Sequence, residues 1–243
     1  MAGKHVPRLH CAQEIIADSA LSLGPDAARH LGSVMRLGSG DEVILFDTIT
    51  GEWRAVIEAV SKRDVVVRPA EYLRPRETVP DIWLLAAPIK RTRFEWTAEK
   101  ACELGAARFQ PVITERTGGV EAQQAKPERL RAHMIEAAEQ CGRTALPELA
   151  DAAALSDVLA DWPENRALIF CDEEGGEPAL DVMRTTPAPA AILIGPEGGF
   201  SDAERDIILS QANSRRLSMG TRILRADTAA AAALAIWQAY HGG

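Results

Sequence analysis

The chain has 243 residues, 47% of them hydrophobic and 26% charged, and its formal net charge at pH 7 is −8. This composition is typical of a globular protein with a substantial core. It excludes a membrane-spanning protein, because the longest apolar run, Ala229–Trp237, is mostly alanine and too short to cross a bilayer. The start, MAGKHVPRLH, has no apolar export segment. We therefore expect a cytoplasmic protein whose four scattered cysteines are reduced thiols.

The acidic net charge argues mildly against a nucleic-acid partner, but the charges are unevenly distributed. Residues 1–76 are neutral, and residues 90–143 carry ten basic and eight acidic side chains. Residues 144–243 carry seven basic and fifteen acidic ones. A basic face on the first half is therefore compatible with the sequence.

The first seventy residues predict a small β-barrel with one helix. Pro25–Leu37 has proline at a helix start and apolar residues at helical spacing. Three short apolar or alternating runs separated by turn residues then predict strands at 42–47, 53–60 and 65–69. The stretch Tyr72–Pro80, with two prolines and mixed charge, is the best candidate for a linker.

From Asp81 onward, strand and helix patterns alternate. Strands are expected at 82–88, 108–113, 167–172, 190–196 and 215–220, and helices at 90–104, 127–141, 178–184, 202–211 and 227–240. Gly105 and Gly142 follow two of these helices as candidate C-caps. Such alternation predicts a mostly parallel sheet that is covered on both faces.

The segment Gly195–Ser201, GPEGGFS, directly follows a predicted buried strand, where open α/β sheets bind ligands. Its glycines allow a ligand to approach the backbone, and Ser201 with Glu204 forms a capping box for the next helix. We expect Glu197 to be a buried carboxylate. The run matches neither GxGxxG nor a P-loop, and no lysine is near it, which disfavours dinucleotide and ATP binding.

A second loop, Met219–Thr228, runs from a strand end into a helix that begins at Asp227 or Thr228. Ile223 and Leu224 are costly to expose, so we expect them to line an apolar ligand surface such as an adenine ring. Arg225 either faces the ligand site or forms a surface pair with Asp227, which contributes little to stability. Together the two loops predict a pocket for a small ligand with an adenine and a charged tail.

These two segments, GPEGGFSDAE and MGTRILRADTA, resemble the signature motifs of SPOUT methyltransferases, specifically the RsmE family of 16S rRNA (uracil-N3)-methyltransferases. The resemblance continues upstream in His30–Asp47, Lys90–Thr117 and Glu136–Leu149, so it covers nearly the whole chain. Two positions depart conservatively from the family pattern: Met219 stands where leucine is common, and Asp227 where glutamate is common.

The resemblance implies an α/β protein with a PUA-like β-barrel RNA-binding domain at 1–72, a linker at 73–80 and a SPOUT trefoil-knot methyltransferase domain at 81–243. It also implies a homodimer, with the alanine-rich helix at or near the interface, and S-adenosylmethionine held mainly by backbone groups. Carried onto this sequence, the cofactor pocket comprises Phe170, Cys171, Asp172, Ile194, Gly195, Pro196, Glu197, Gly198, Gly199, Ser218, Met219, Gly220, Ile223 and Leu224.

Methylation at N3 of a uracil requires removal of a weakly acidic N–H proton while the methyl donor is held in line. Arg225 is the candidate for stabilising the resulting anion or holding the target phosphate. Two roles stay open for Glu197, which either accepts the proton or bonds backbone amides. Gln140 and Arg143 are candidates for contacts with the target base or its backbone.

Phosphate contacts should supply most of the RNA affinity. The candidate basic residues are Arg8, Arg29 and Arg36 on the barrel side, and Lys90, Arg91, Arg93 and Arg116 at the start of the second domain. The target uridine must be flipped or unpaired to reach the pocket. The five histidines show no metal-ligand spacing, so we expect no metal.

The leading prediction is therefore an S-adenosylmethionine-dependent enzyme that makes 3-methyluridine at position 1498 of 16S rRNA in the small ribosomal subunit. Two alternatives stay open. One is a SPOUT methyltransferase that acts on another base or on a ribose 2′-hydroxyl. The other is a non-catalytic RNA-binding protein of ribosome assembly.

Overall fold

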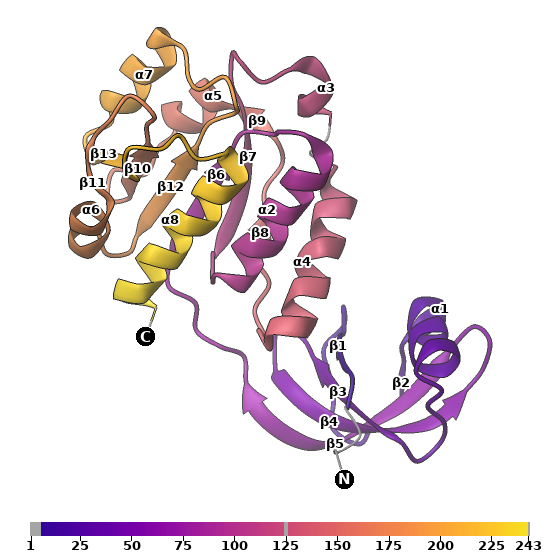
Figure 1. The fold of residues 1–243 in the computed structure, drawn as a ribbon. Helices are drawn as coiled ribbons and strands as arrows, with labels where there is room; N and C mark the ends of the chain where they lie inside the picture. The colour runs from indigo at the N-terminus through magenta and orange to yellow at the C-terminus, as the bar shows by residue number, and fades with distance from the viewer. Residues whose placement is uncertain (1–5, 124–125, 243) are drawn as a thin grey trace. The chain divides into compact units, whose positions relative to one another are not determined.

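The computed structural model describes residues 6–123 and 126–242, which form two compact units (Figure 1). The first unit comprises the chain up to Thr78 together with Ala138–Ala145, and the second comprises Val79–Ala137 and the chain from Leu146 onward. No helix in the described ranges is long and apolar enough to cross a membrane.

The first unit is built on a five-stranded sheet in the order β1-β3-β4-β5-β2. Its strands are β1 (Arg8–His10), β2 (Leu21–Ser22), β3 (Glu42–Phe46), β4 (Gly51–Val60) and β5 (Val65–Pro75). Strands β3, β4 and β5 are antiparallel neighbours, and β1 joins the edge of β3 in parallel. Alternate residues of these strands, among them Val43, Leu45 and Ile57, bury their side chains in one core with Leu31.

The predicted strands at 42–47, 53–60 and 65–69 are confirmed, but two boundaries differ. β5 continues to Pro75, into the predicted linker, because it stays paired with the start of β4 down to Gly51. The predicted helix at 25–37 is a short turn, α1 (Gly24–Ala27), that passes into a π-helix at Ala28–Val34. The helical segment stops before Arg36, which takes a left-handed backbone with φ of +57°.

The second unit contains a parallel sheet in the order β11-β13-β10-β12-β6-β7-β8, with β9 also paired to β7. The strands are β6 (Ile82–Ala86), β7 (Arg108–Ile113), β8 (Glu148–Leu149), β9 (Ala153–Ala154), β10 (Ala167–Cys171), β11 (Glu177–Pro178), β12 (Ala190–Ile194) and β13 (Ser214–Ser218). All five principal strands were predicted. The two-residue strands β8, β9 and β11 were not, because a run that short carries no periodicity.

Helices cover both faces of this sheet. They are α2 (Arg91–Glu103), α3 (Gly119–Ala122), α4 (Pro127–Cys141), α5 (Leu155–Ala160), α6 (Ala179–Thr185), α7 (Asp202–Leu209) and α8 (Ala226–His241). Helix α8 packs against α2, α6 and β12, whereas α5 packs against α7 and β7. Every residue of β12 is buried, as expected for a central strand covered on both sides. Gly105 and Gly142 have φ of +76° and +83°, which confirms them as helix-terminating glycines.

Candidate active site

One cavity of about 370 Å³ lies where β10, β12 and β13 end. β10 pairs with both of the other strands, so the three loops that follow them emerge side by side at one edge of the sheet. The lining residues come from these loops and the start of α8: Cys171–Glu173, Ile194–Gly199, Leu217–Arg225, Ala226 and Ala229. The chain thus gathers at one place the two loops that the sequence singled out.

The loop between β12 and α7 is tightly built. A Cβ atom on Gly195 would lie 2.7 Å from the ring of Phe200, which is itself buried and packs edge-on against Phe170 with ring centroids 5.2 Å apart. Gly199 takes φ of +67°, and its N–H donates to the carbonyl of Pro196 at 2.9 Å. The predicted capping box is confirmed: Glu204 N donates to Ser201 Oγ at 3.3 Å, and Ser201 N donates to Glu204 Oε2 at 2.9 Å.

The loop between β13 and α8 is more open. Gly220 takes φ of +102°, and its N–H donates to Ser218 Oγ over a long distance, 3.4 Å. The side chain of Ile223 is 84% exposed although it lines the cavity, and Leu224 is half-buried. Arg225 is the N-cap residue of α8 and makes no side-chain cap.

Arg225 is exposed at the cavity and takes part in no ion pair among the described residues. The alternative pairing with Asp227 is therefore wrong, because Asp227 lies next to a different arginine. Arg93 Nε is 3.9 Å from Asp227 Oδ2. The guanidinium of Arg225 thus remains available to a bound ligand.

The third loop, after β10, is acidic and anchored from outside the cavity. The Asp172 carboxylate is almost wholly buried and accepts hydrogen bonds from Arg205 and, at 2.6 Å, from Arg216 Nε. Arg205 also donates to Glu173 Oε1 at 2.9 Å. Burial by itself lowers the pKa of Arg205, but the hydrogen bond to Asp172 and the charges of Glu173 and Glu174 outweigh it and raise the pKa.

Two predicted pocket residues play different parts from those expected. Phe170 does not line the cavity, because its side chain points into the core of the second unit. Glu197 lines the cavity but is exposed, so the expectation of a buried carboxylate is wrong. The remaining predicted pocket residues line the cavity, Asp172 among them with its carboxylate committed to two arginines.

Sequence reasoning missed several lining residues: Glu173, Leu217, Ala226 and Ala229. Most of them are immediate neighbours of predicted residues, so continuity along the loops was the available signal. Ala229 lies one turn into α8, and only the packing of that helix beside the cavity reveals it. Burial first, and then the charge of Asp172, raises the pKa of the Cys171 thiol to about 12, so this lining thiol stays protonated.

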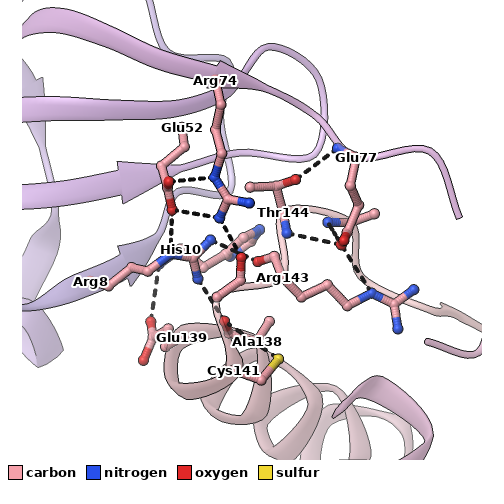
Figure 2. A network of polar contacts seen from close by, with 12 residues as sticks. Arg8, His10, Glu52, Arg74, Glu77, Ala138, Glu139, Cys141, Arg143 and Thr144 are labelled. Carbon is pink, nitrogen blue, oxygen red and sulfur yellow. Dashed lines mark hydrogen bonds and ion pairs between the residues drawn. The ribbon is translucent and has the colours of Figure 1, made fainter. Parts of the chain in front are cut away.

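Arg8 and Arg143, which were expected to contact RNA, are used inside the first unit (Figure 2). Arg8 Nε pairs with Glu52 Oε1 at 2.5 Å, and its two terminal nitrogens donate to the carbonyls of Ala138 and Arg143 at 2.6 and 2.8 Å. The Arg143 side chain is 5% exposed, with Nε 3.3 Å from Glu77 Oε1. Both arginines therefore hold the segment Ala138–Ala145 within its unit, which corrects their predicted role.

The other RNA candidates are accessible to different degrees. Arg29, Arg36 and Gln140 are exposed in the first unit, as is His30. In the second unit Lys90, Arg91 and Arg116 are exposed and Arg93 is half-buried. Carboxylates accompany two of these cations at the start of α2: Arg91 Nε lies 4.0 Å from Glu95 Oε1, and Arg93 Nε lies 3.9 Å from Asp227 Oδ2.

Arg116 directly contacts the cavity loop. Its Nη1 donates to the carbonyl oxygen of Gly198 at 2.7 Å. Within residues 6–123 and 126–242, no group of three or more His, Cys, Asp or Glu side chains is placed to hold a metal ion. The candidate site is thus a glycine-rich arrangement of loops whose charged lining comprises Asp172, Glu173, Glu197, Arg222 and Arg225.

Comparison with known proteins shows the family to which this chain belongs. An RNA methyltransferase domain model matches residues 75–238, and an RNA methyltransferase PUA domain model matches residues 23–70. The ribosomal RNA small subunit methyltransferase E of Rickettsia conorii is 30% identical over 233 residues, which cover 94% of this chain and 93% of that protein. The protein of the same name from Synechocystis is 33% identical, covering 94% of this chain and 76% of that one.

Two solved structures are similar to this chain over nearly its whole length. A Legionella pneumophila protein solved with S-adenosylmethionine as bound cofactor is 34% identical, with a TM-score of 0.87 and 98% of both chains covered. The ribosomal RNA small subunit methyltransferase E of Neisseria gonorrhoeae, bound to S-adenosylmethionine, is 25% identical with the same TM-score and coverage. The fold is thus α/β with an N-terminal PUA-like domain and an RNA methyltransferase domain, and the chain belongs to the ribosomal RNA small subunit methyltransferase E family.

Proposed function

We propose that this protein transfers the methyl group of S-adenosylmethionine to ribosomal RNA of the small subunit, at N3 of the uridine at position 1498 of 16S rRNA. The observation that supports this best is the cavity at the ends of β10, β12 and β13, built from the two motifs that resemble those of the family. Relatives over nearly the whole chain are named for small-subunit rRNA methylation, and two similar structures hold S-adenosylmethionine.

The lining of the cavity suits this cofactor. Its volume of about 370 Å³ lies at the compact end of the range for small-molecule sites. Leu217, Leu224 and Ile223 offer apolar surface to an adenine, and the glycines at 195, 198 and 199 let a ligand approach the backbone. S-adenosylmethionine carries an ammonium, a sulfonium and a carboxylate. The acidic side chains Glu173 and Glu197 complement its two cations, and Arg222 complements its carboxylate.

When bound, S-adenosylmethionine supplies a methyl group that is already activated for transfer, so positioning is the main task of the protein. We assign Arg225 to the anion that forms when the uracil N3 loses its proton, because its exposed guanidinium borders the cavity and lies in no internal ion pair of the described residues. Glu197 is the candidate proton acceptor, with an exposed carboxylate from which the proton can pass to solvent.

RNA affinity in this proposal comes from exposed cations rather than from Arg8 and Arg143. The exposed candidates are Lys90 and Arg91 in the second unit and Arg29 and Arg36 in the first, with the half-buried Arg93 and the neutral Gln140 as further candidate contacts. Each phosphate contact releases condensed counterions, so binding should weaken steeply as salt concentration rises. A 30S substrate would place the reaction in the cytoplasm.

We also propose that the protein works as a homodimer through α8. Tyr240 on α8 is 44% exposed and Leu180 on α6 is 58% exposed, and these two helices pack together in the second unit. Both side chains therefore offer apolar surface to a second copy of the chain. Sedimentation of the wild type against Tyr240→Glu tests this, with a shift toward monomer expected in the variant.

The experiment that tests the proposed activity is methyl transfer from labelled S-adenosylmethionine to 30S subunits that lack the modification, with mass spectrometry to locate the label. Label on one uridine N3, lost in Arg225→Ala, is the expected result. Transfer to another base or to a ribose would keep the cofactor and overturn the substrate. No transfer to any RNA, with no cofactor binding by calorimetry, would favour a non-catalytic assembly protein.

A further inference from the structure

A short turn after β7, Thr114–Thr117, reaches the cavity loop from outside. The turn is internally fixed: Thr117 N donates to the carbonyl of Thr114 at 3.1 Å, and Thr114 N donates to Thr117 Oγ1 at 3.0 Å. β7 is not a neighbour of β12, since β6 lies between them in the sheet. The turn therefore extends past the end of β6 to meet the loop that follows β12.

Two hydrogen bonds join the turn to that loop and to the first turn of α7, which follows it. Arg116 Nη1 donates to the carbonyl oxygen of Gly198 at 2.7 Å. Glu115 N donates to Glu204 Oε1 at 2.8 Å, while the other oxygen of Glu204 accepts from Ser201 N in the capping box. One carboxylate thus holds both the start of α7 and the turn, and one guanidinium holds the middle of the loop.

The contact at Gly198 is close as well as polar. A Cβ atom built on Gly198 would lie 3.4 Å from Cβ of Arg116, so the arginine stem covers the outer side of this residue. Gly198 and Gly199 line the cavity on the inner side. A glycine pair has more conformational freedom than any other, so its shape must be imposed by contacts. Arg116 supplies such a contact on the side away from a ligand.

We propose that Arg116 is a positioning residue for the cofactor: by holding the Gly198 carbonyl, it fixes the glycine loop in the shape that binds S-adenosylmethionine. This inference rests on the proposed function and deepens it. It also assigns Arg116, expected from the sequence to contact phosphate, to a different task. A residue that shapes a binding loop changes cofactor affinity and leaves the rate at saturating cofactor unaltered.

The test compares Arg116→Ala and Arg116→Lys with the wild type by calorimetry with S-adenosylmethionine and by steady-state methyl transfer to 30S subunits. Loss of a charge-assisted hydrogen bond predicts a rise of about tenfold in Kd and KM for the cofactor in Arg116→Ala, with kcat retained. Arg116→Lys keeps a donor on a long stem and should recover part of the affinity. Glu204→Gln leaves one side-chain oxygen for two backbone donors, Glu115 N and Ser201 N. This variant should therefore also raise the Kd for S-adenosylmethionine.

Arg131→Ala is the matched control, because Arg131 is an exposed arginine of the same unit on α4 and does not line the cavity. It should leave the Kd for S-adenosylmethionine unchanged. An Arg116→Ala variant that binds the cofactor like the wild type would overturn the inference, and a loss of RNA affinity with a shallower salt dependence would return Arg116 to phosphate binding. A wild type that binds no S-adenosylmethionine would instead overturn the proposed function itself.

Discussion

Two sides of the same cavity are built in opposite ways. The loop between β12 and α7 is held by a buried Phe200, a capping box and the turn after β7. The loop between β13 and α8 leaves Ile223 84% exposed and enters its helix without a side-chain cap. In a site of this kind, the first loop already has its binding shape before the ligand arrives, whereas the second loop forms its contacts only when the ligand is bound. We infer that the first side sets the position of the cofactor and that the second closes over it.

The largest effect should come from Arg225 on the open side. Replacing it with alanine removes the guanidinium that we assign to the developing anion and leaves the pre-formed side intact. Removal of one such group typically lowers kcat by about 100-fold or more. Single-turnover methyl transfer to 30S subunits measures the loss, and calorimetry should show cofactor affinity close to that of the wild type. A variant with full activity would remove Arg225 from the mechanism.

A pair of glycine substitutions separates the two sides. Both Gly199 and Gly220 have left-handed backbones, where a side chain costs about 1–2 kcal/mol. A Cβ on Gly199 would also fall on the Glu173 carboxylate, whereas a Cβ on Gly220 meets no atom within 4 Å. Gly199→Ala should therefore lower both the melting temperature and cofactor affinity by more than Gly220→Ala does. Equal effects in both measurements would contradict the contrast between the loops.

Ile223 tests whether the open side gains its contacts from the ligand. Its side chain is mostly exposed without ligand, so Ile223→Ala should leave the melting temperature of the free protein unchanged. If the side chain covers the adenine in the complex, the variant loses buried apolar surface worth about 1–2 kcal/mol of binding. Calorimetry with S-adenosylmethionine should then show a weaker Kd. An unchanged Kd would place the adenine elsewhere.

The ion pairs of Glu52 with Arg8 and Arg74 lie in the first unit, and changing them should have the smallest effect on the cavity. Their contribution to the stability of the folded protein should depend on pH. Burial by itself raises the pKa of Glu52, but hydrogen bonds from Arg74 and Arg8 outweigh it and lower the pKa below its ordinary 4.5. The stabilisation of the folded state by the ionised Glu52 carboxylate is therefore fully present above pH 4.5. It is lost as the pH falls through the lower pKa that Glu52 has in the folded protein.

Glu52→Gln should accordingly lower the free energy of unfolding by about 1–3 kcal/mol at pH 7, with a difference from the wild type that narrows below pH 4.5. Denaturant unfolding at several pH values measures both quantities. Cofactor affinity should be unaffected, because Glu52 belongs to the first unit and the cavity residues to the second. A parallel loss of affinity would show that the cavity depends on this network.

The sequence was most informative where local pattern decides the structure. The five principal strands, the capping box at Ser201 and the glycine helix ends all depend on residues close together in the chain. The two cavity loops were found because each is a glycine-containing segment that directly follows a predicted strand. The expectation of a SPOUT fold with a trefoil knot came from resemblance to a family rather than from spacing.

What the sequence did not reveal depends on distant partners. Arg8 resembled a surface cation, but its partners at Ala138 and Arg143 lie about 130 residues away in the chain. The exposure of Glu197 depends on how its loop packs, and the use of Arg116 depends on a strand that is not a neighbour of the loop. Charge and residue type show that such groups need partners, but only the packed structure shows which partners they have.

Hydrogen exchange with and without S-adenosylmethionine tests the contrast between the two loops most directly. Our account predicts that peptides covering Ile194–Glu204 are protected in the free protein and change little on binding, whereas peptides covering Met219–Ala226 exchange quickly and become protected only with the cofactor. Fast exchange in both loops of the free protein, or protection gained mainly at Ile194–Glu204, would contradict it.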